Sequence, residues 1–129
     1  MAKVLVVDDE TQVRSLIRAR LERAGYEVSE AQDCETALAR YRQEPADVVI
    51  TDLVMPGLSG HELIRALAAV SPDVRIVAIS GAVDRDIHGL LATARDHGAV
   101  CTLMKPFTSE QLFEAVRRVL GHHGVGDTR

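Results

Sequence analysis

Five short runs of mostly apolar residues recur along the chain, and each is followed by a longer stretch in which apolar residues repeat with helical spacing. Runs of about five residues rich in valine, isoleucine and leucine are typical of β-strands, and the spaced stretches are typical of amphipathic helices. The predicted strands cover residues 3–7, 26–31, 47–51, 74–79 and 100–104. The pattern therefore predicts five consecutive strand–helix units.

The helical stretches carry recognisable start and stop signals. The predicted helices cover residues 11–24, 33–44, 59–70, 84–98 and 108–120. Capping boxes, in which a serine or threonine and an acid or amide three residues later satisfy free backbone N–H groups, open the third and the fifth. On the first helix the spacing places five residues on the buried face, namely Val13, Leu16, Ile17, Leu21 and Ala24. On the third it places Leu67 and Val70 there.

The alternation of strands and helices predicts one parallel sheet between two helical layers, with right-handed crossovers. The strand at 26–31 has polar residues at Glu27, Ser29 and Glu30, as an edge strand would, whereas the first and third strands are almost wholly apolar. This favours a three-layer, doubly wound α/β domain with strand order 2-1-3-4-5. In that order a ligand crevice opens between strands 1 and 3.

Composition supports a single packed domain. The chain has 129 residues, of which 47% are hydrophobic, and we assign 1–121 to the domain and 122–129 to a flexible tail. A net charge of −4 without a basic block argues against direct contact with nucleic acid. No signal peptide or membrane-length apolar stretch is present, so a cytoplasmic protein is expected. Cys34 and Cys101 lack neighbours at metal-ligand spacing and are expected to be free, mostly buried thiols.

Charged residues follow three of the predicted strands. Asp8 and Asp9 follow the first strand, Asp52 the third and Lys105 the fifth. Taken singly, the aspartates could be helix caps or turn residues, and the lysine a solvated side chain. The carboxyl ends of parallel strands meet at one edge of a sheet, however, so all four side chains are expected in one crevice. This coincidence favours a functional site.

The expected cluster suits phosphoryl transfer. Three carboxylates in one crevice repel one another, and an all-oxygen ligand set favours a hard cation such as Mg²⁺. A divalent cation and the ammonium of Lys105, placed around one reactive carboxylate, can neutralise charge on a transferring phosphoryl group. Asp52 would then be the nucleophile. Ser80, at the end of the fourth strand, adds a hydroxyl to the same edge.

Four motifs at these positions resemble those of the receiver domains of two-component response regulators. They are VVDDE at 6–10, TDLVMPG at 51–57, ISG at 79–81 and KPF at 105–107. Each motif is modest alone, but the four in this order and spacing are specific, and the resemblance covers about residues 3–120. It implies a (βα)5 flavodoxin-like fold.

The resemblance also implies roles for the acidic residues. Asp52 would accept a phosphoryl group from a sensor histidine kinase or a histidine phosphotransfer protein. Asp8, Asp9 and Asp52, together with the backbone carbonyl of Val54, would hold Mg²⁺. The chain would not be an enzyme in the ordinary sense, since it accepts the phosphoryl group and assists only its own phosphorylation and dephosphorylation.

A switch is the last implication of the resemblance. Lys105 would pair with the phosphoryl group, Ser80 would turn to hydrogen-bond it, and the bond between Lys105 and Pro106 would be cis. The surface formed by the helix at 84–98, the strand at 100–104 and the helix at 108–120 would then change its preference for an unknown output partner. Many receivers carry an aromatic switch residue where this chain has Thr102, so output coupling is expected to differ.

Two alternatives remain open at this point. A Mg²⁺-dependent phosphatase acting through an aspartyl phosphate would usually carry a second aspartate two residues after the nucleophile, where Val54 stands. A receiver that only binds a partner, without phosphorylation, would be expected to lack Asp9, Asp52 or Lys105. The sequence does not distinguish a stand-alone regulator from a receiver cut from a larger protein.

Overall fold

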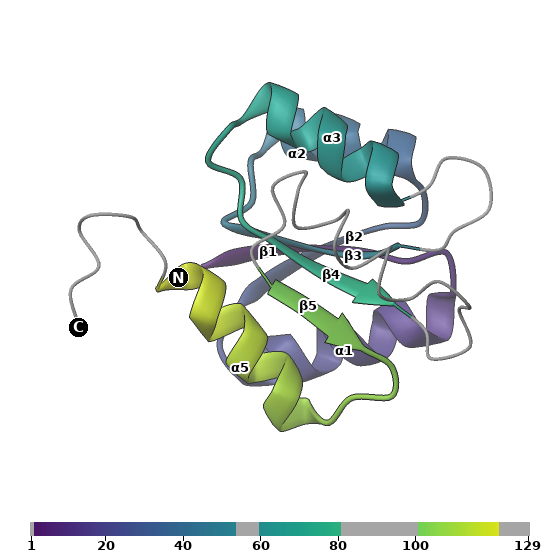
Figure 1. Ribbon diagram of the computed structural model, residues 1–129. Coiled ribbons are helices and arrows are strands. Elements are labelled where there is room, and N and C mark those ends of the chain that lie inside the picture. Colours follow the sequence, from purple (N-terminus) through teal and green to yellow (C-terminus); the bar gives the residue numbers. More distant parts are fainter. Residues whose placement is uncertain (1, 54–59, 81–100, 122–129) are drawn as a thin grey trace.

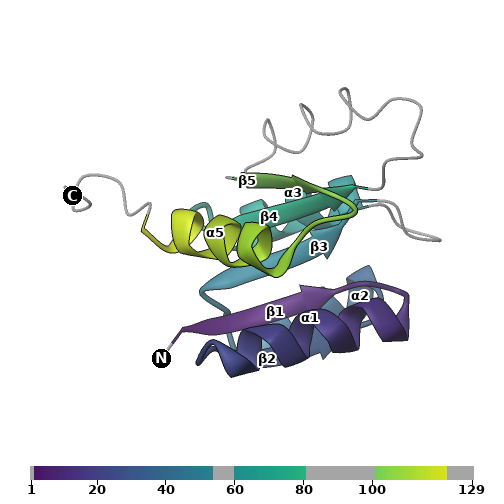
Figure 2. The ribbon, with the colours of Figure 1, turned by 90° about the horizontal axis from the view of Figure 1, so that it is seen from below.

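A computed structural model of the chain describes residues 2–53, 60–80 and 101–121 (Figure 1). Its strands are β1 (Lys3–Val7), β2 (Glu27–Ala31), β3 (Val48–Asp52), β4 (Ile76–Ser80) and β5 (Cys101–Met104). They form one sheet in the order β2-β1-β3-β4-β5, and every neighbouring pair is parallel (Figure 2). The predicted strand order is therefore confirmed, with the polar strand β2 at one edge.

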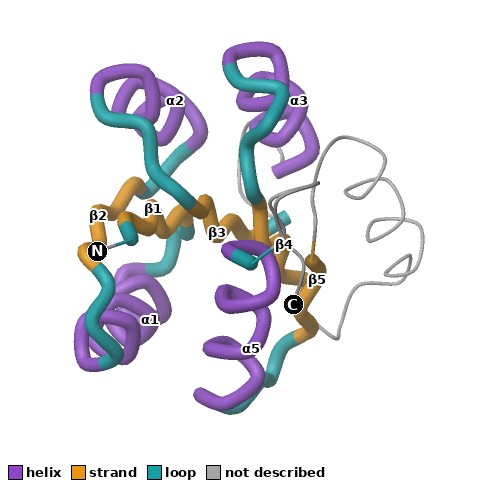
Figure 3. Tube along the Cα trace, turned by 90° about the vertical axis from the view of Figure 1, so that its left-hand side faces the viewer, coloured by secondary structure: helices purple, strands orange, loops and turns teal. Residues whose placement is uncertain are grey.

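Helices cover both faces of the sheet. They are α1 (Thr11–Arg23), α2 (Cys34–Gln43), α3 (Gly60–Val70) and α5 (Ser109–Leu120). Figure 3 shows α2 and α3 on one side of the strands and α1 and α5 on the other. The predicted helix at 84–98 and the predicted tail at 122–129 lie outside the described residues. Observed element bounds differ from the predicted ones by at most two residues at either end.

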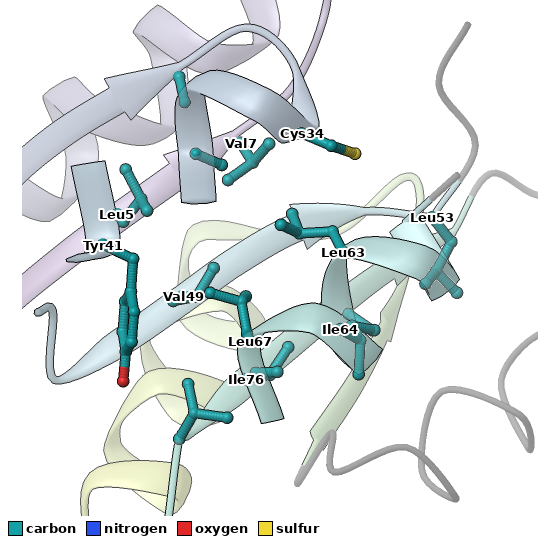
Figure 4. Close-up of a cluster of buried hydrophobic side chains, with 14 residues drawn as sticks. Leu5, Val7, Cys34, Tyr41, Val49, Leu53, Leu63, Ile64, Leu67 and Ile76 are labelled. Atoms are coloured by element: carbon teal, nitrogen blue, oxygen red, sulfur yellow. The ribbon is translucent and has the colours of Figure 1, made fainter. Parts of the chain in front are cut away.

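The sheet separates two hydrophobic cores. The first lies under α2 and α3 (Figure 4) and consists of Leu5, Val7, Ala31, Cys34, Ala37, Tyr41, Val49, Leu53, Leu63, Ile64, Leu67, Val74, Ile76 and Ala78. The second lies under α1 and α5 and consists of Val4, Val6, Ile17, Leu21, Val28, Val48, Ile50, Val77, Ile79, Leu112, Ala115, Val116 and Val119. Successive residues of β1 alternate between the two cores, because side chains of a strand point alternately to opposite faces.

Three residues predicted to lie on buried helix faces are exposed instead, namely Leu16, Val70 and Ala24, the last of which follows the end of α1. Leu16 is 51% exposed, since it lies about 100° around α1 from the buried Ile17 and so falls outside the face that contacts the sheet. Val70 is 40% exposed. It shares a face with Leu67, but it is the last residue of α3, and its position at the helix end explains its exposure.

The capping hydrogen bonds predicted for α2 and α5 are present. The Asp33 side chain accepts a hydrogen bond from the Thr36 N–H at 2.7 Å, and Thr108 and Gln111 form the complete capping box of α5. The capping box predicted for α3 involves Ser59, outside the described residues. Cys34 and Cys101 do not form a disulfide; Cys34 is buried and Cys101 only half-buried. Within the described ranges, no helix is long and apolar enough to cross a membrane.

A partly buried ion-pair group joins α1 to the end of β2. The Glu30 carboxylate accepts a hydrogen bond from Arg14 Nε at 2.7 Å and another from Arg18 Nη1 at 2.8 Å. The bond from Arg18, helped by that from Arg14, lowers the pKa of Glu30 although partial burial of the carboxylate opposes the shift. Arg14 and Arg18 lie one helical turn apart, close enough for their charges to repel each other. The Glu30 carboxylate bonds to both and offsets this repulsion.

This lowered pKa predicts a pH-dependent contribution to stability. We expect Glu30→Gln to reduce the free energy of unfolding by about 1 kcal/mol at pH 7. The wild-type contribution is present above the pKa of an unfolded-chain glutamate, about 4.3, and is lost as pH falls through the lower pKa of the folded state. Urea unfolding of both proteins between pH 3 and pH 7 should therefore give curves that converge in acid. A constant difference across that range would contradict the assignment.

Candidate functional site

The ends of four adjacent strands build one polar edge. Asp52 is the last residue of β3, and Asp8 directly follows β1, whose Val7 pairs with Thr51. Ser80 is the last residue of β4, and Lys105 directly follows β5. The Lys105 N–H donates to the carbonyl of Ser80 at 2.8 Å, which continues the β4–β5 ladder by one residue. The predicted convergence of these positions is thus confirmed.

Three carboxylates gather at this edge. Oxygen atoms of Asp8, Asp9 and Asp52 all lie within 4.8 Å of one another. Asp8 is 1% exposed and Asp52 6%, whereas Asp9 faces solvent. At that separation two unit charges repel by about 3 kcal/mol at an effective dielectric constant near 20, and less where water screens Asp9. The cluster is therefore destabilising unless a positive charge compensates it.

The carboxylate of Asp8 is buried but only partly hydrogen-bonded. Its Oδ1 accepts from the Glu10 N–H at 2.8 Å, but its buried Oδ2 has no hydrogen-bond partner among the described residues. Burial, with smaller contributions from the charges of Asp52 and Asp9, raises the pKa of Asp8 against the opposing effects of the Glu10 N–H and Lys105. A buried oxygen left without a donor, beside two further carboxylates, fits a hard divalent cation.

Lys105 supplies the fixed positive charge. Its Nζ donates to Asp52 Oδ2 at 2.9 Å and lies 3.8 Å from Asp8 Oδ2. Partial burial works against the ammonium, but the hydrogen bond and the charge of Asp52 outweigh it and raise the pKa of Lys105. The peptide bond between Lys105 and Pro106 is cis, as expected. The ammonium form therefore persists at neutral pH and holds one oxygen of the Asp52 carboxylate.

The remaining predicted residues fall in different places. Ser80 is fully buried at the edge, in backbone contact with Lys105. Thr102 lies mid-strand in β5, paired with Ala78, and lines a groove between β5 and α5 rather than the acidic cluster. Val54 lies outside the described residues. The structure also brings in Arg14, whose Nη1 donates to the Asp8 carbonyl at 2.7 Å and which the sequence reasoning missed.

Crowding of like charges predicts an unusual substitution effect. We expect Asp9→Asn to raise the free energy of unfolding of the metal-free protein by about 0.5 kcal/mol, since it removes repulsion from an exposed position. Urea unfolding in the presence of EDTA measures this change. Asp73→Asn, at an exposed position between α3 and β4, is the matched control and should leave stability unaltered. A destabilised Asp9→Asn protein would show that the three carboxylates do not repel appreciably.

The parallel sheet of order 2-1-3-4-5, with this acidic cluster and lysine at its carboxyl edge, defines a flavodoxin-like receiver domain. The family model described as "Response regulator receiver domain" matches residues 4–117, and the chain belongs to that family. It is a receiver domain of the two-component response regulators, consistent with a phosphoacceptor role.

Individual relatives agree with this assignment. The chain is 35% identical to the phosphate regulon transcriptional regulatory protein PhoB of Pseudomonas aeruginosa, over 97% of this chain and 54% of that protein. It is 30% identical to the response regulator receiver protein CpdR of Brucella abortus, over 93% of this chain and 98% of that protein. It thus spans about half the length of the first of these and nearly all of the second.

Solved structures match the fold throughout. A receiver domain protein from Clostridium thermocellum superposes with a TM-score of 0.84 at 34% identity, covering 93% of this chain and 94% of that one. The chemotaxis protein CheY4 of Vibrio cholerae gives a TM-score of 0.84 at 34% identity, covering 93% of this chain and 99% of that one.

Proposed function

We propose that this domain is the phosphoacceptor module of a two-component or phosphorelay system, located in the cytoplasm. Asp52 takes a phosphoryl group from a phosphohistidine on a sensor histidine kinase or a histidine phosphotransfer protein. One observation carries the proposal: the Asp52 carboxylate lies within 4.8 Å of two other carboxylates and 2.9 Å from the Lys105 ammonium. That arrangement surrounds one carboxylate with the groups that phosphoryl transfer requires.

The same residues fit a magnesium ion. Asp8, Asp9 and Asp52 offer only oxygen ligands, and Asp8 Oδ2 has no hydrogen-bond donor among the described residues, so it is available as a ligand atom. These three side chains would hold the ion, and the carbonyl of Val54, outside the described residues, is the fourth ligand we expect. When bound, Mg²⁺ supplies positive charge that neutralises the phosphoryl oxygens and offsets the repulsion among the carboxylates.

Each protein group has a part in the transfer. A carboxylate oxygen of Asp52 attacks phosphorus in line, the phosphorus–nitrogen bond breaks, and the imidazole leaves with the bonding electron pair and takes up a proton. The Lys105 ammonium, now bonded to Asp52 Oδ2, moves its hydrogen bond to a phosphoryl oxygen. The Ser80 hydroxyl, at the end of the neighbouring strand, donates to another.

The transferred group would act as a switch rather than as a turnover intermediate. It adds about −1.5 to −2 charges at the edge where Lys105 and Ser80 follow or end their strands and can donate to it. We infer that the resulting shift reaches an output partner through the surface of β5, α5 and the helix predicted at 84–98. Thr102 lies in the β5–α5 groove of that surface, where it provides no aromatic ring to swing. We therefore propose that the chain is not an enzyme, and from the sequence we expect it to contact neither nucleic acid nor membrane.

Incubation with a small phosphodonor such as acetyl phosphate tests the proposal. Intact-mass analysis should show one added phosphoryl group per chain in Mg²⁺ and none in EDTA, and hydroxylamine should remove it, as it does acyl phosphates. Steady release of phosphate from varied organic esters would indicate a phosphatase instead. Binding of Mg²⁺ without any mass gain would indicate a partner-binding module that is not phosphorylated.

A further inference from the structure

The turn between β1 and α1, which carries Asp8 and Asp9, lacks the usual support of a helix start. The N-cap residue Glu10 makes no side-chain capping bond, and the first turn of α1 has no acidic residue. Arg14 reaches back over this turn instead. Its Nη1 donates to the carbonyl of Asp8 at 2.7 Å, and its backbone N–H donates to the carbonyl of Glu10 at 3.0 Å.

Arg14 is itself held in a fixed orientation. Its Nε donates to Glu30 Oε1 at 2.7 Å, the second oxygen of Glu30 accepts from Arg18 at 2.8 Å, and the Arg14 side chain is only 12% exposed. The guanidinium is a rigid planar fork, so two bonds made from it in different directions fix both partners relative to each other. The backbone N–H of Asp8 also donates to Ala31, next to Glu30, at 3.2 Å.

We propose that Arg14, oriented by Glu30, is a positioning residue for the divalent-cation site. It fixes the Asp8 carbonyl, and through it the backbone that presents the carboxylates of Asp8 and Asp9. The inference rests on the proposed function, because it concerns the same metal site. Within the described residues, Arg14 bonds to Asp8, Glu10 and Glu30, so it acts on the site through the backbone of the turn.

Charge and geometry predict opposite effects for this arginine. A positive charge near a cation site disfavours the cation, so on electrostatic grounds alone Arg14→Ala should tighten Mg²⁺ binding. On geometric grounds the substitution frees the turn and should weaken binding by about tenfold, the lower range for groups that orient metal ligands. Arg14→Lys keeps the charge, but an ammonium cannot reproduce the two directed hydrogen bonds of the guanidinium to Glu30 and to the Asp8 carbonyl. It should therefore also weaken Mg²⁺ binding, by a smaller factor.

Backbone-amide NMR titrations with Mg²⁺ on the wild type, Arg14→Ala, Arg14→Lys and Arg117→Ala measure these affinities. Arg117 is the matched control, an arginine paired with Glu114 in the last turn of α5. Weaker binding by both Arg14 variants, with Arg117→Ala within about twofold of wild type, supports the proposal. Equal or tighter binding by the Arg14 variants overturns it. Should Arg14→Ala not fold, Arg14→Lys alone decides by the same criterion.

Two further readouts separate positioning from simple loss of stability. In the metal-free protein, the Glu10 amide, which donates to Asp8 Oδ1, should exchange with solvent faster in Arg14→Ala than in wild type. At saturating Mg²⁺ the phosphorylation rate should return to near wild type. If the wild type itself binds no Mg²⁺, the proposed function fails; if the wild type binds and the Arg14 variants bind equally well, only the positioning role fails.

Discussion

Replacing Asp52 with asparagine is expected to abolish phosphoryl uptake, with a loss of at least about a thousandfold in rate, because the amide offers no nucleophilic oxyanion. The protein should still fold. An amide oxygen can accept the hydrogen bond that Lys105 Nζ now donates to Asp52 Oδ2, and one charge of the crowded cluster is removed. Intact mass after incubation with Mg²⁺ and acetyl phosphate gives the measurement.

Asp73→Asn is the control for this loss. It removes the same charge from an exposed position outside the site and should be phosphorylated like the wild type. A mass gain that persists in Asp52→Asn and remains sensitive to hydroxylamine would place the phosphoryl group on another carboxylate. The assignment of Asp52 as acceptor would then be wrong, although the fold and family would stand.

The largest expected effect on stability comes from Leu67→Ala. Leu67 is fully buried in the core between α3 and the sheet, and its truncation leaves a cavity that should reduce the free energy of unfolding by about 3 kcal/mol. Typical domains are stable by only 5–15 kcal/mol, so this is a large fraction of the total. Urea unfolding of the metal-free protein is the measurement.

Val70→Ala provides the comparison on the same helix. Val70 was predicted to be buried but is 40% exposed, and its truncation should change the free energy of unfolding by less than about 1 kcal/mol. Similar losses in Leu67→Ala and Val70→Ala would mean that the end of α3 packs more closely than the structure indicates.

The sequence predicted the strands well because their apolar runs are short and separated by clear helix signals. The polar residues Glu27 and Glu30 placed β2 at the edge, and from this the strand order followed. The errors arose where periodicity alone was used. Helical spacing selects a stripe of residues, but it does not show where the contacting surface ends, so Leu16 and Val70 were misplaced.

The site was predicted in its position but not in its contacts. Parallel topology brings Asp8, Asp52 and Lys105 to one edge, yet only the structure shows that Lys105 bonds to Asp52 and that one oxygen of Asp8 has no hydrogen-bond donor among the described residues. Arg14 was missed because a basic residue on an amphipathic helix looks like solvated surface. Its signal was the arginine pair one turn apart on α1, opposite a glutamate at the end of the neighbouring strand.

The separation of the two hydrophobic cores by the sheet has a consequence for how this domain tolerates sequence change. Val4 and Val6 of β1 point into one core and Leu5 and Val7 into the other. Because the described buried side chains on opposite sides of the sheet belong to separate clusters, the effects of truncating one on each side should add in a double mutant to within about 0.5 kcal/mol. The α2–α3 layer and the α1–α5 layer can therefore diverge between homologues almost independently, provided that the alternation within each strand is kept.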